Sequence, residues 1–257
     1  MAKARHSDYQ QEIRDQIAAW DAKPGLRAVY QHWYQRIVSQ LAGSGPTIEV
    51  GAGCGNFKRF YPQAIATDLF PNGSWIDICA DARELPFADG SLGNVVLIDC
   101  LHHLPRPIDF LLHAGAKLRP GGRVILLEPA ATPWARLVWR VCHHEPVDVG
   151  VDFVAERYQE PPDNSGFTYA NMGTAQVLFV RQRAAVAECL SDLVIKSVDW
   201  SDWIVYPLTG GFSYLSRAPS RWIEPLHRWE EASVPRIIRR WFALRMLVVL
   251  ERPSVPR

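Results

Sequence analysis

Three glycines alternate with small residues directly after a short apolar run, and here the backbone itself could bind a ligand. The segment 47–55 reads TIEVGAGCG, with glycines at 51, 53 and 55. Glycine lacks a Cβ and adopts positive φ at little cost, so the chain can pass close to a ligand. We therefore expect backbone N–H groups, rather than long side chains, to meet a ligand at this turn.

The glycine spacing separates two classes of cofactor. A dinucleotide site requires G-x-G-x-x-G, but position 56 is Asn. The turn instead follows the pattern E-x-G-x-G-x-G and resembles the first motif of class I S-adenosylmethionine-dependent methyltransferases. That resemblance implies S-adenosyl-L-methionine as the cofactor, with S-adenosyl-L-homocysteine as the product, bound by Glu49, Gly51, Ala52, Gly53 and Gly55.

Two further acidic positions follow at the distances that this family shows. Asp68 ends the second predicted strand, where two carboxylate oxygens can hold ribose hydroxyls, with Leu69 beside it near the adenine. A loop aspartate that caps the next turn is the alternative. The segment 81–87, DARELPF, resembles the D-A-x-x-L-P-F segment of the family, which implies that Asp81 and Ala82 address the adenine edge.

A cysteine and two histidines follow the fourth predicted strand in the segment 99–104, DCLHHL. Ligands bind beyond the carboxyl ends of strands in such sheets, so Asp99 and Cys100 are expected to border the methionine half of the cofactor. His103 is a candidate catalytic base because histidine titrates near neutral pH; a packed structural histidine is the alternative. The spacing does not resemble a closed zinc site, so no metal is predicted.

A second polar cluster, CHHEPVD, occupies residues 142–148. A hydroxyl acceptor must lose its proton as the methyl group arrives, and His144 or Glu145 could take it. The alternative is a solvated face of an inserted helix.

Five apolar segments alternate with short helical ones and predict a doubly wound, parallel α/β sheet: 47–50, 64–67, 75–80, 93–98 and 124–127. The resemblance implies that segments 193–200 and 241–250 complete a seven-stranded, mostly parallel Rossmann-like methyltransferase fold, with the last strand antiparallel. Asn94 stands where the family usually has aspartate and is expected to support the start of its strand.

The chain divides into four predicted parts. Residues 1–45 form N-terminal helices that cover the active site, and 46–130 form the cofactor-binding half of the sheet. Residues 131–192 are a substrate-binding insertion after the fifth strand, since a long polar and aromatic excursion usually serves as a lid or binding loop. Residues 193–257 hold the last two strands and a basic segment rich in Trp and Arg.

Charge and composition limit the classes of partner and the cellular compartment that we expect. The net charge of +1 and the absence of an RNA-binding module predict no nucleic-acid partner. The five scattered cysteines, the lack of an apolar N-terminal leader and the lack of an 18-residue apolar run favour the cytoplasm. From Arg217 to Arg257 there are nine arginines and four glutamates, interleaved with tryptophans. This segment either covers the sheet or rests on an anionic membrane.

These observations predict a methyltransferase that acts on a small or amphiphilic metabolite. O-methylation of a hydroxyl-rich, sugar-like acceptor is favoured, because histidine and carboxylate groups flank the expected acceptor position. The alternatives are C-methylation of a quinone- or isoprenoid-type lipid and a catalytically silent cofactor-binding scaffold.

Overall fold

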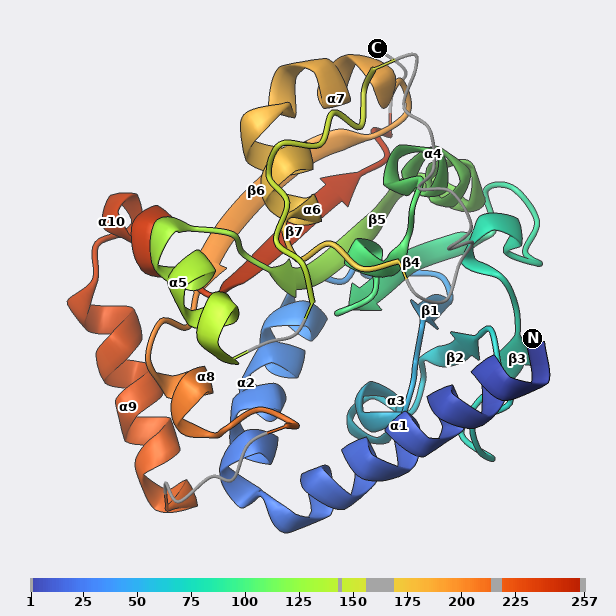
Figure 1. The fold of residues 1–257 in the computed structure, drawn as a ribbon. Helices are drawn as coiled ribbons and strands as arrows, with labels where there is room; N and C mark the ends of the chain where they lie inside the picture. Colours follow the sequence, from blue (N-terminus) through green and yellow to red (C-terminus); the bar gives the residue numbers. More distant parts are fainter. Residues whose placement is uncertain (1, 143–144, 156–168, 214–218, 255–257) are drawn as a thin grey trace.

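Seven strands form one sheet in the order β3-β2-β1-β4-β5-β7-β6 in the computed structural model, which describes residues 2–142, 145–155, 169–213 and 219–254 (Figure 1). The strands are β1 (Thr47–Val50), β2 (Ile65–Asp68), β3 (Ile78–Cys79), β4 (Leu92–Ile98), β5 (Leu118–Pro129), β6 (Val194–Ser201) and β7 (Arg245–Glu251). Strand β7 runs antiparallel to β5 and β6, and the pairs among β1 to β5 are parallel. The predicted seven-stranded, doubly wound fold is confirmed.

Two predicted strands are shorter in the structure. The third was expected over 75–80, but the indole of Trp75 donates a hydrogen bond to the carbonyl of Gly53 at 3.0 Å and lies against the glycine turn instead. The seventh was expected to begin at Trp241, which belongs to the helix α10 (Arg236–Phe242). Pro235 sets the start of that helix with a φ of −54°.

Helices cover both faces of the sheet. They are α1 (Ala2–Ala22), α2 (Pro24–Ser39), α3 (Asn56–Phe60), α4 (Pro107–Lys117), α5 (Pro133–Cys142), α6 (Thr174–Gln176), α7 (Arg183–Cys189), α8 (Val205–Leu208), α9 (Ser220–Ser233) and α10. None of the helices in the described ranges is both long and apolar enough to cross a membrane.

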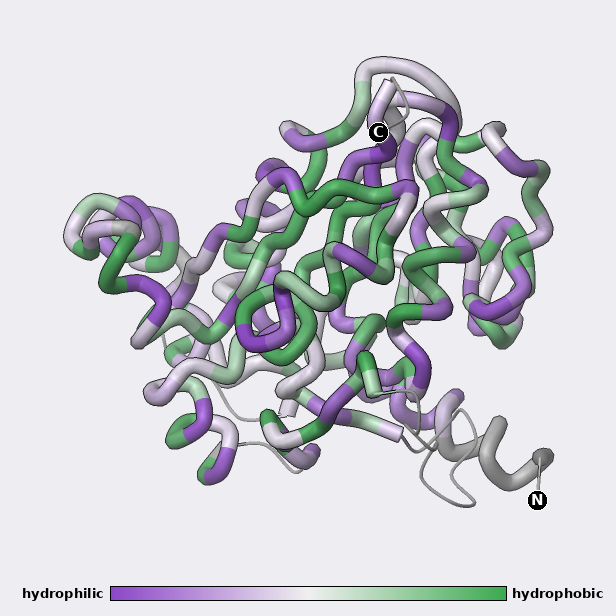
Figure 2. Tube along the Cα trace, turned by 90° about the horizontal axis from the view of Figure 1, so that it is seen from above, coloured by the Kyte–Doolittle hydropathy of each residue, from purple (hydrophilic) through white to green (hydrophobic). Residues whose placement is uncertain are grey.

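The central strands are apolar on both faces and feed two separate cores. On β4, Val95 and Leu97 pack on the side of α4 and α7, whereas Val96 packs on the side of α2. This is the period-two alternation of a strand buried on both faces. Figure 2 shows the same concentration of apolar residues along the middle of the molecule.

Two polar contacts fix the start of β4. The Asn94 amide accepts a hydrogen bond from the backbone of Ala42 at 2.7 Å and donates to the hydroxyl of Thr47 at 3.0 Å. Asn94 therefore supports the start of its strand, as expected, and ties it to the segment that follows α2.

Candidate active site

A cavity of about 560 Å³ lies beyond the carboxyl ends of the parallel strands. Its floor includes the last residues of β1, β2 and β4, at Val50, Asp68 and Ile98. Helix α1, helix α5 and residues 206–213 also line the cavity. This is the edge at which open α/β sheets bind ligands.

The glycine turn borders the cavity with its backbone. Gly51, Gly53 and Gly55 have φ values of 72°, 51° and 71°. A Cβ on Gly51 would lie 2.5 Å from Sγ of Cys100, and one on Gly55 would lie 2.3 Å from the Trp75 ring. At Gly53 the nearest atom is Cδ1 of Ile13, at 3.6 Å. Two of the glycines are therefore required by packing, and Gly53 presents its backbone to the cavity beneath α1.

Asp68 is held in place by the same turn. Its carboxylate accepts the N–H of Gly53 at 2.8 Å, the N–H of Phe70 at 3.1 Å and the hydroxyl of Tyr9 at 3.3 Å. Burial raises the pKa of Asp68, and the two N–H groups oppose this rise. The side chain thus caps the following turn and also lines the cavity. The turn-capping role and the ribose-binding role predicted for Asp68 are therefore compatible.

Glu49 is a buried carboxyl group, and one of its oxygens is unsatisfied among the residues that the structure describes. Its Oε2 has no hydrogen-bond partner within the described part of the chain. Burial, with a smaller contribution from the charge of Asp68, raises the pKa of Glu49 to about 8. An unpartnered oxygen in a cavity wall suits a ligand that brings N–H or O–H groups, so Glu49, Asp68 and Gly53 fit a nucleoside with an amino-acid tail.

Asp81 lies at the far end of this wall. It accepts the backbone N–H of Arg83 at 2.8 Å and forms an ion pair with the Arg83 guanidinium at 2.7 Å. Asp81, Ala82 and Leu69 all line the cavity. The pairing with Arg83 was not expected from the sequence.

The end of β4 carries a charge pair between the half-buried Asp99 and the buried Arg245. Asp99, with a φ of 52°, pairs with Arg245 and accepts the hydroxyl of Tyr30 at 3.2 Å. The Arg245 guanidinium lies 4.6 Å from the Trp33 ring centre and 4.7 Å from that of Tyr206, within cation–π distance. Tyr30 thus belongs both to the core and to the cavity wall.

His102 and His103 follow on a 3₁₀ turn (Leu101–His103) and lie on the cavity wall near Glu145. Nδ1 of His102 is 2.7 Å from Oε2 of the buried Glu128. Burial lowers the pKa of His102, but the Glu128 carboxylate outweighs it and raises this pKa to about 10. Burial, and then the charge of His102, lower the pKa of His103.

The structure gathers most of the expected site residues around one cavity. These are Glu49, Gly51, Ala52, Gly53, Asp68, Leu69, Asp81, Ala82, Asp99, Cys100, His103 and Glu145. Gly55 lies behind the turn against Trp75, and His144 falls outside the described residues.

Sequence reasoning missed Tyr9, Arg245 and Glu128, and it placed His102 in the segment 99–104 without choosing it as the base. Tyr9, His102 and Arg245 line the cavity, and Glu128 orients His102 from behind. Arg245 had a local signal, a charge at the head of an apolar strand. Glu128 follows the fifth predicted strand, so the rule that pointed to Asp68 could have found it. Tyr9 comes from a distant helix and left no pattern in the sequence.

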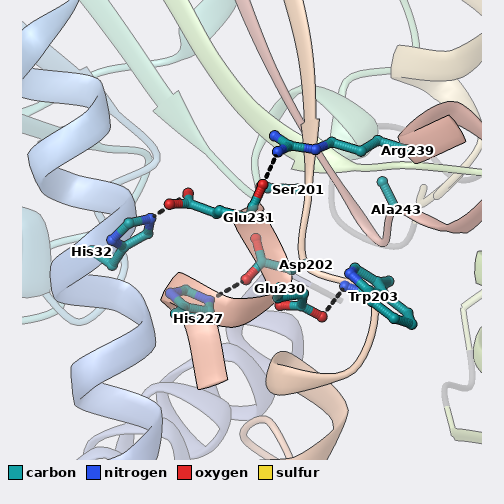
Figure 3. A pocket seen from close by; sticks show the side chains of 9 residues that line it. All are labelled: His32, Ser201, Asp202, Trp203, His227, Glu230, Glu231, Arg239 and Ala243. Atoms are coloured by element: carbon teal, nitrogen blue, oxygen red, sulfur yellow. Dashed lines mark hydrogen bonds and ion pairs between the residues drawn. The ribbon is translucent and has the colours of Figure 1, made fainter. Parts of the chain in front are cut away.

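A separate polar cluster, built around Asp202, His227 and Glu230, lies outside the cavity, between β6, α2 and α9 (Figure 3). Asp202 is 2.6 Å from Nε2 of His227 and accepts the indole N–H of Trp33 at 2.8 Å. Glu230 accepts the backbone N–H groups of Trp203 and Val205 at 2.8 and 3.2 Å. The space between these groups is only about 10 Å³. This cluster joins α9 to the sheet.

Known proteins share parts of this sequence and its fold. Residues 23–158, more than half of the chain, match a family described as a methyltransferase domain. A 27-O-demethylrifamycin SV methyltransferase from Amycolatopsis mediterranei is 31% identical over 118 residues, a match that spans 35% of this chain and only 43% of that protein.

Two solved structures share the fold at low sequence identity. A SAM-dependent methyltransferase from Archaeoglobus fulgidus superimposes with a TM-score of 0.52 at 12% identity, over 88% of this chain and 94% of its own. A geranyl diphosphate C-methyltransferase from Streptomyces coelicolor gives a TM-score of 0.50 at 12% identity, over 86% and 78%. With the family match over residues 23–158, we conclude that the chain belongs to the methyltransferase domain family, as a class I S-adenosylmethionine-dependent methyltransferase.

Proposed function

We propose that this enzyme transfers the methyl group of S-adenosylmethionine to a hydroxyl oxygen of a small, hydroxyl-rich acceptor. The cofactor supplies an electrophilic methyl group on a sulfonium. The observation that carries the proposal is that His103 and Glu145, from two distant segments, line the same cavity as the glycine turn. The similarity to a 27-O-demethylrifamycin SV methyltransferase adds support for an oxygen acceptor.

In this proposal one wall of the cavity holds the cofactor. The backbone at Gly51, Ala52 and Gly53 approaches it closely, and the Asp68 carboxylate exchanges its bond to Tyr9 for the ribose hydroxyls. Glu49 provides an acceptor for the amino-acid end, where its Oε2 has no partner in the described residues. Asp81 and Ala82 border the adenine.

In this proposal the acceptor binds beside the turn that follows β4, where His102 and His103 lie. Methyl transfer needs the acceptor oxygen, the methyl carbon and the sulfur in line, so much of the rate comes from positioning. A hydroxyl must also lose its proton, because its pKa lies far above neutrality. The cluster of His102, His103 and Glu145 is the polar part of the wall that promotes this loss.

The test is methyl transfer from cofactor with a ¹³C-labelled methyl group to a panel of polyhydroxylated and phenolic acceptors. We expect a product whose labelled carbon shows the chemical shift of an O-methyl group. His103→Gln should lower kcat at least tenfold and leave the KM for the cofactor within about twofold, since general acid–base effects are about 10²–10⁴-fold. His113→Gln is a matched control, because His113 lies on α4 and accepts the N–H of Leu85 at 3.0 Å. Labelled C-methyl products alone would overturn the proposal.

C-methylation of an isoprenoid- or quinone-type lipid is the second candidate. It is favoured by exposed apolar side chains on α5, α9 and α10, which include Leu137, Trp222 and Ile237. The fold similarity to a geranyl diphosphate C-methyltransferase is compatible with it. This candidate requires the enzyme to meet a lipid surface.

A further inference from the structure

Two groups of histidine and acidic side chains have donor atoms close enough to share a metal ion within the described residues. The group around Asp202 and His227 is already satisfied, since its atoms bond to one another and to backbone N–H groups (Figure 3). The group of His102, His103 and Glu145 differs, because Nε2 of each ring faces the carboxylate of Glu145, at 3.6 and 3.8 Å.

The first ring is oriented from behind by a carboxylate. Nδ1 of His102 lies 2.7 Å from Oε2 of Glu128. Glu128 is itself fixed by the backbone N–H groups of Cys100 and Leu101, at 3.0 and 2.7 Å. An ionised carboxylate only accepts, so Nδ1 carries a hydrogen and Nε2 is turned toward Glu145.

The second ring is oriented by a backbone carbonyl. Nδ1 of His103 lies 3.2 Å from the oxygen of Tyr169. A carbonyl oxygen cannot donate, so this nitrogen also carries the hydrogen. In the neutral ring, Nε2 of His103 then keeps its lone pair and points toward Glu145.

The remaining distances are those of ligands around a common ion. Nε2 of His102 lies 3.6 Å from Oε2 of Glu145, and Nε2 of His103 lies 3.8 Å from Oε1. These separations are too long for hydrogen bonds. Ligands bound at about 2.1 Å in a tetrahedron lie roughly 3.4 Å apart. The three groups are therefore spaced much as metal ligands are.

We propose that His102, His103 and Glu145 bind a divalent transition-metal ion of the Zn²⁺ type on the cavity wall. Two imidazoles and one carboxylate are a common ligand set for such ions, and a tetrahedral ion with three protein ligands keeps one position open. Ligating histidines generally hydrogen-bond their other nitrogen to a carboxylate or carbonyl, as both do here. The ion would displace the proton from Nε2 of His102.

The consequence for catalysis rests on the proposed function. A metal ion lowers the pKa of an oxygen that binds to it, so an acceptor hydroxyl at the open position loses its proton to water in the cavity. A lone pair of this oxygen then forms the O–CH₃ bond, and the electrons of the S–CH₃ bond remain on sulfur. No change in oxidation state is required.

The test is a titration of the full chain with Co²⁺, a Zn²⁺ substitute with visible absorption. We expect one tight site per chain, with the intense bands of a four-coordinate ion. His103→Gln and Glu145→Gln should each weaken Co²⁺ binding at least tenfold without changing the melting temperature, because neither side chain is fully buried. His227→Gln, in the other cluster, is the matched control and should leave Co²⁺ affinity unchanged.

Absence of Co²⁺ binding by the wild-type chain, or binding that follows His227 instead of His103, would overturn the site. Methyl transfer is scored separately. O-methylation that persists after complete removal of metal by a chelator would overturn the catalytic part and leave the proposed function intact. O-methylation that is lost with the metal and restored by Zn²⁺ supports both.

Discussion

At the scale of single residues, the cavity is defined by carboxylates whose surroundings differ. Asp68 receives two backbone N–H groups and a tyrosine hydroxyl. Glu49 has an oxygen without a partner in the described chain and a strongly raised pKa. Burial of a polar group is costly unless it is hydrogen-bonded, so a site of this kind gains stability when its ligand arrives.

Glu49 should make the stability of the cofactor-free protein depend on pH. Its pKa rises from 4.5 to about 8 on folding, so its contribution to stability is full below pH 4.5 and is lost as pH rises through about 8. At low pH we expect Glu49→Gln and the wild type to unfold at nearly the same urea concentration. Above pH 8 the variant should be the more stable protein, by about 3–5 kcal/mol in the free energy of unfolding. Urea unfolding of both proteins across this range measures the difference; parallel curves at every pH would contradict the prediction.

Asp68 should contribute to cofactor affinity. Replacing it by alanine removes the acceptor for the ribose hydroxyls, and hydrogen bonds to charged groups are worth about 1.5–3 kcal/mol. We expect the Kd for S-adenosylmethionine to increase by about 10- to 150-fold, measured by calorimetry. Asp89→Asn, which removes an exposed ion pair with Lys117, is the control. An unchanged Kd for Asp68→Ala would remove Asp68 from the ribose site.

The sequence predicted where residues lie in the fold when a local pattern exists. Gly51, Gly53 and Asp68 follow buried strands, and the position beyond a strand end is enough to bring them to one edge. Tyr9 reaches the site from a helix whose sequence gives no sign of it, and Glu128, although it also ends a strand, acts through its contact with His102. Their roles depend on side-chain directions that spacing does not encode.

At the scale of elements, the helices that were predicted within residues 1–45 are present as α1 and α2. The predicted ends of two strands were wrong, because strand ends depend on tertiary contacts. Trp75 leaves β3 to contact Gly53, and Trp241 ends a short helix that an apolar run had suggested to be strand. Trp75 thus packs on the glycine turn, which local propensity could not reveal, whereas Trp241 lies on a helix and is exposed.

The attachment of α9 offers a test at this scale. Asp202 bonds to His227 on α9 and to Trp33 on α2, and all three side chains are buried. Removing one member of a buried charged pair costs about 3–5 kcal/mol, because it leaves the other member uncompensated. We expect Asp202→Ala to lose stability by this amount in urea unfolding followed by circular dichroism.

The control lies on the same helix. Glu224 forms an exposed ion pair with Arg228, so Glu224→Gln should change stability by less than about 1 kcal/mol. Equal effects of the Asp202 and Glu224 variants would mean that the buried cluster does not hold α9 in place.

At the scale of the whole molecule, the sheet order follows from rules that act on the chain as a whole. Alternating strands and helices with right-handed crossovers permit few topologies, which is why the five parallel strands were predictable. The sixth strand and the antiparallel seventh were expected from the family resemblance. These rules do not predict the position of the segment after β5. Its placement beside His102 and His103, through Glu145, became visible only in three dimensions.

The exposed apolar side chains of the described residues are concentrated on one side of the molecule, along α5, α9 and α10 (Figure 1). They include Trp134, Leu137, Val141, Trp222, Trp229, Ile237, Ile238, Trp241 and Phe242. Helix α5 also turns Val138 and Trp139 into the cavity. A single helix therefore connects this apolar surface to the proposed acceptor site.

This surface should bind anionic vesicles. Apolar side chains that enter the headgroup region, aided by arginines such as Arg221 and Arg240, attract a negatively charged bilayer. We expect co-sedimentation with phosphatidylserine-containing vesicles at low salt and weaker binding at high salt, since salt screens the charges. Trp222→Ser with Ile237→Ser should reduce binding at least fivefold, whereas Leu112→Ser, an exposed apolar position on α4, should not. Failure of the wild-type chain to bind at low salt would exclude the lipid surface and weaken the lipid acceptor, leaving O-methylation of a water-soluble acceptor as the stronger assignment.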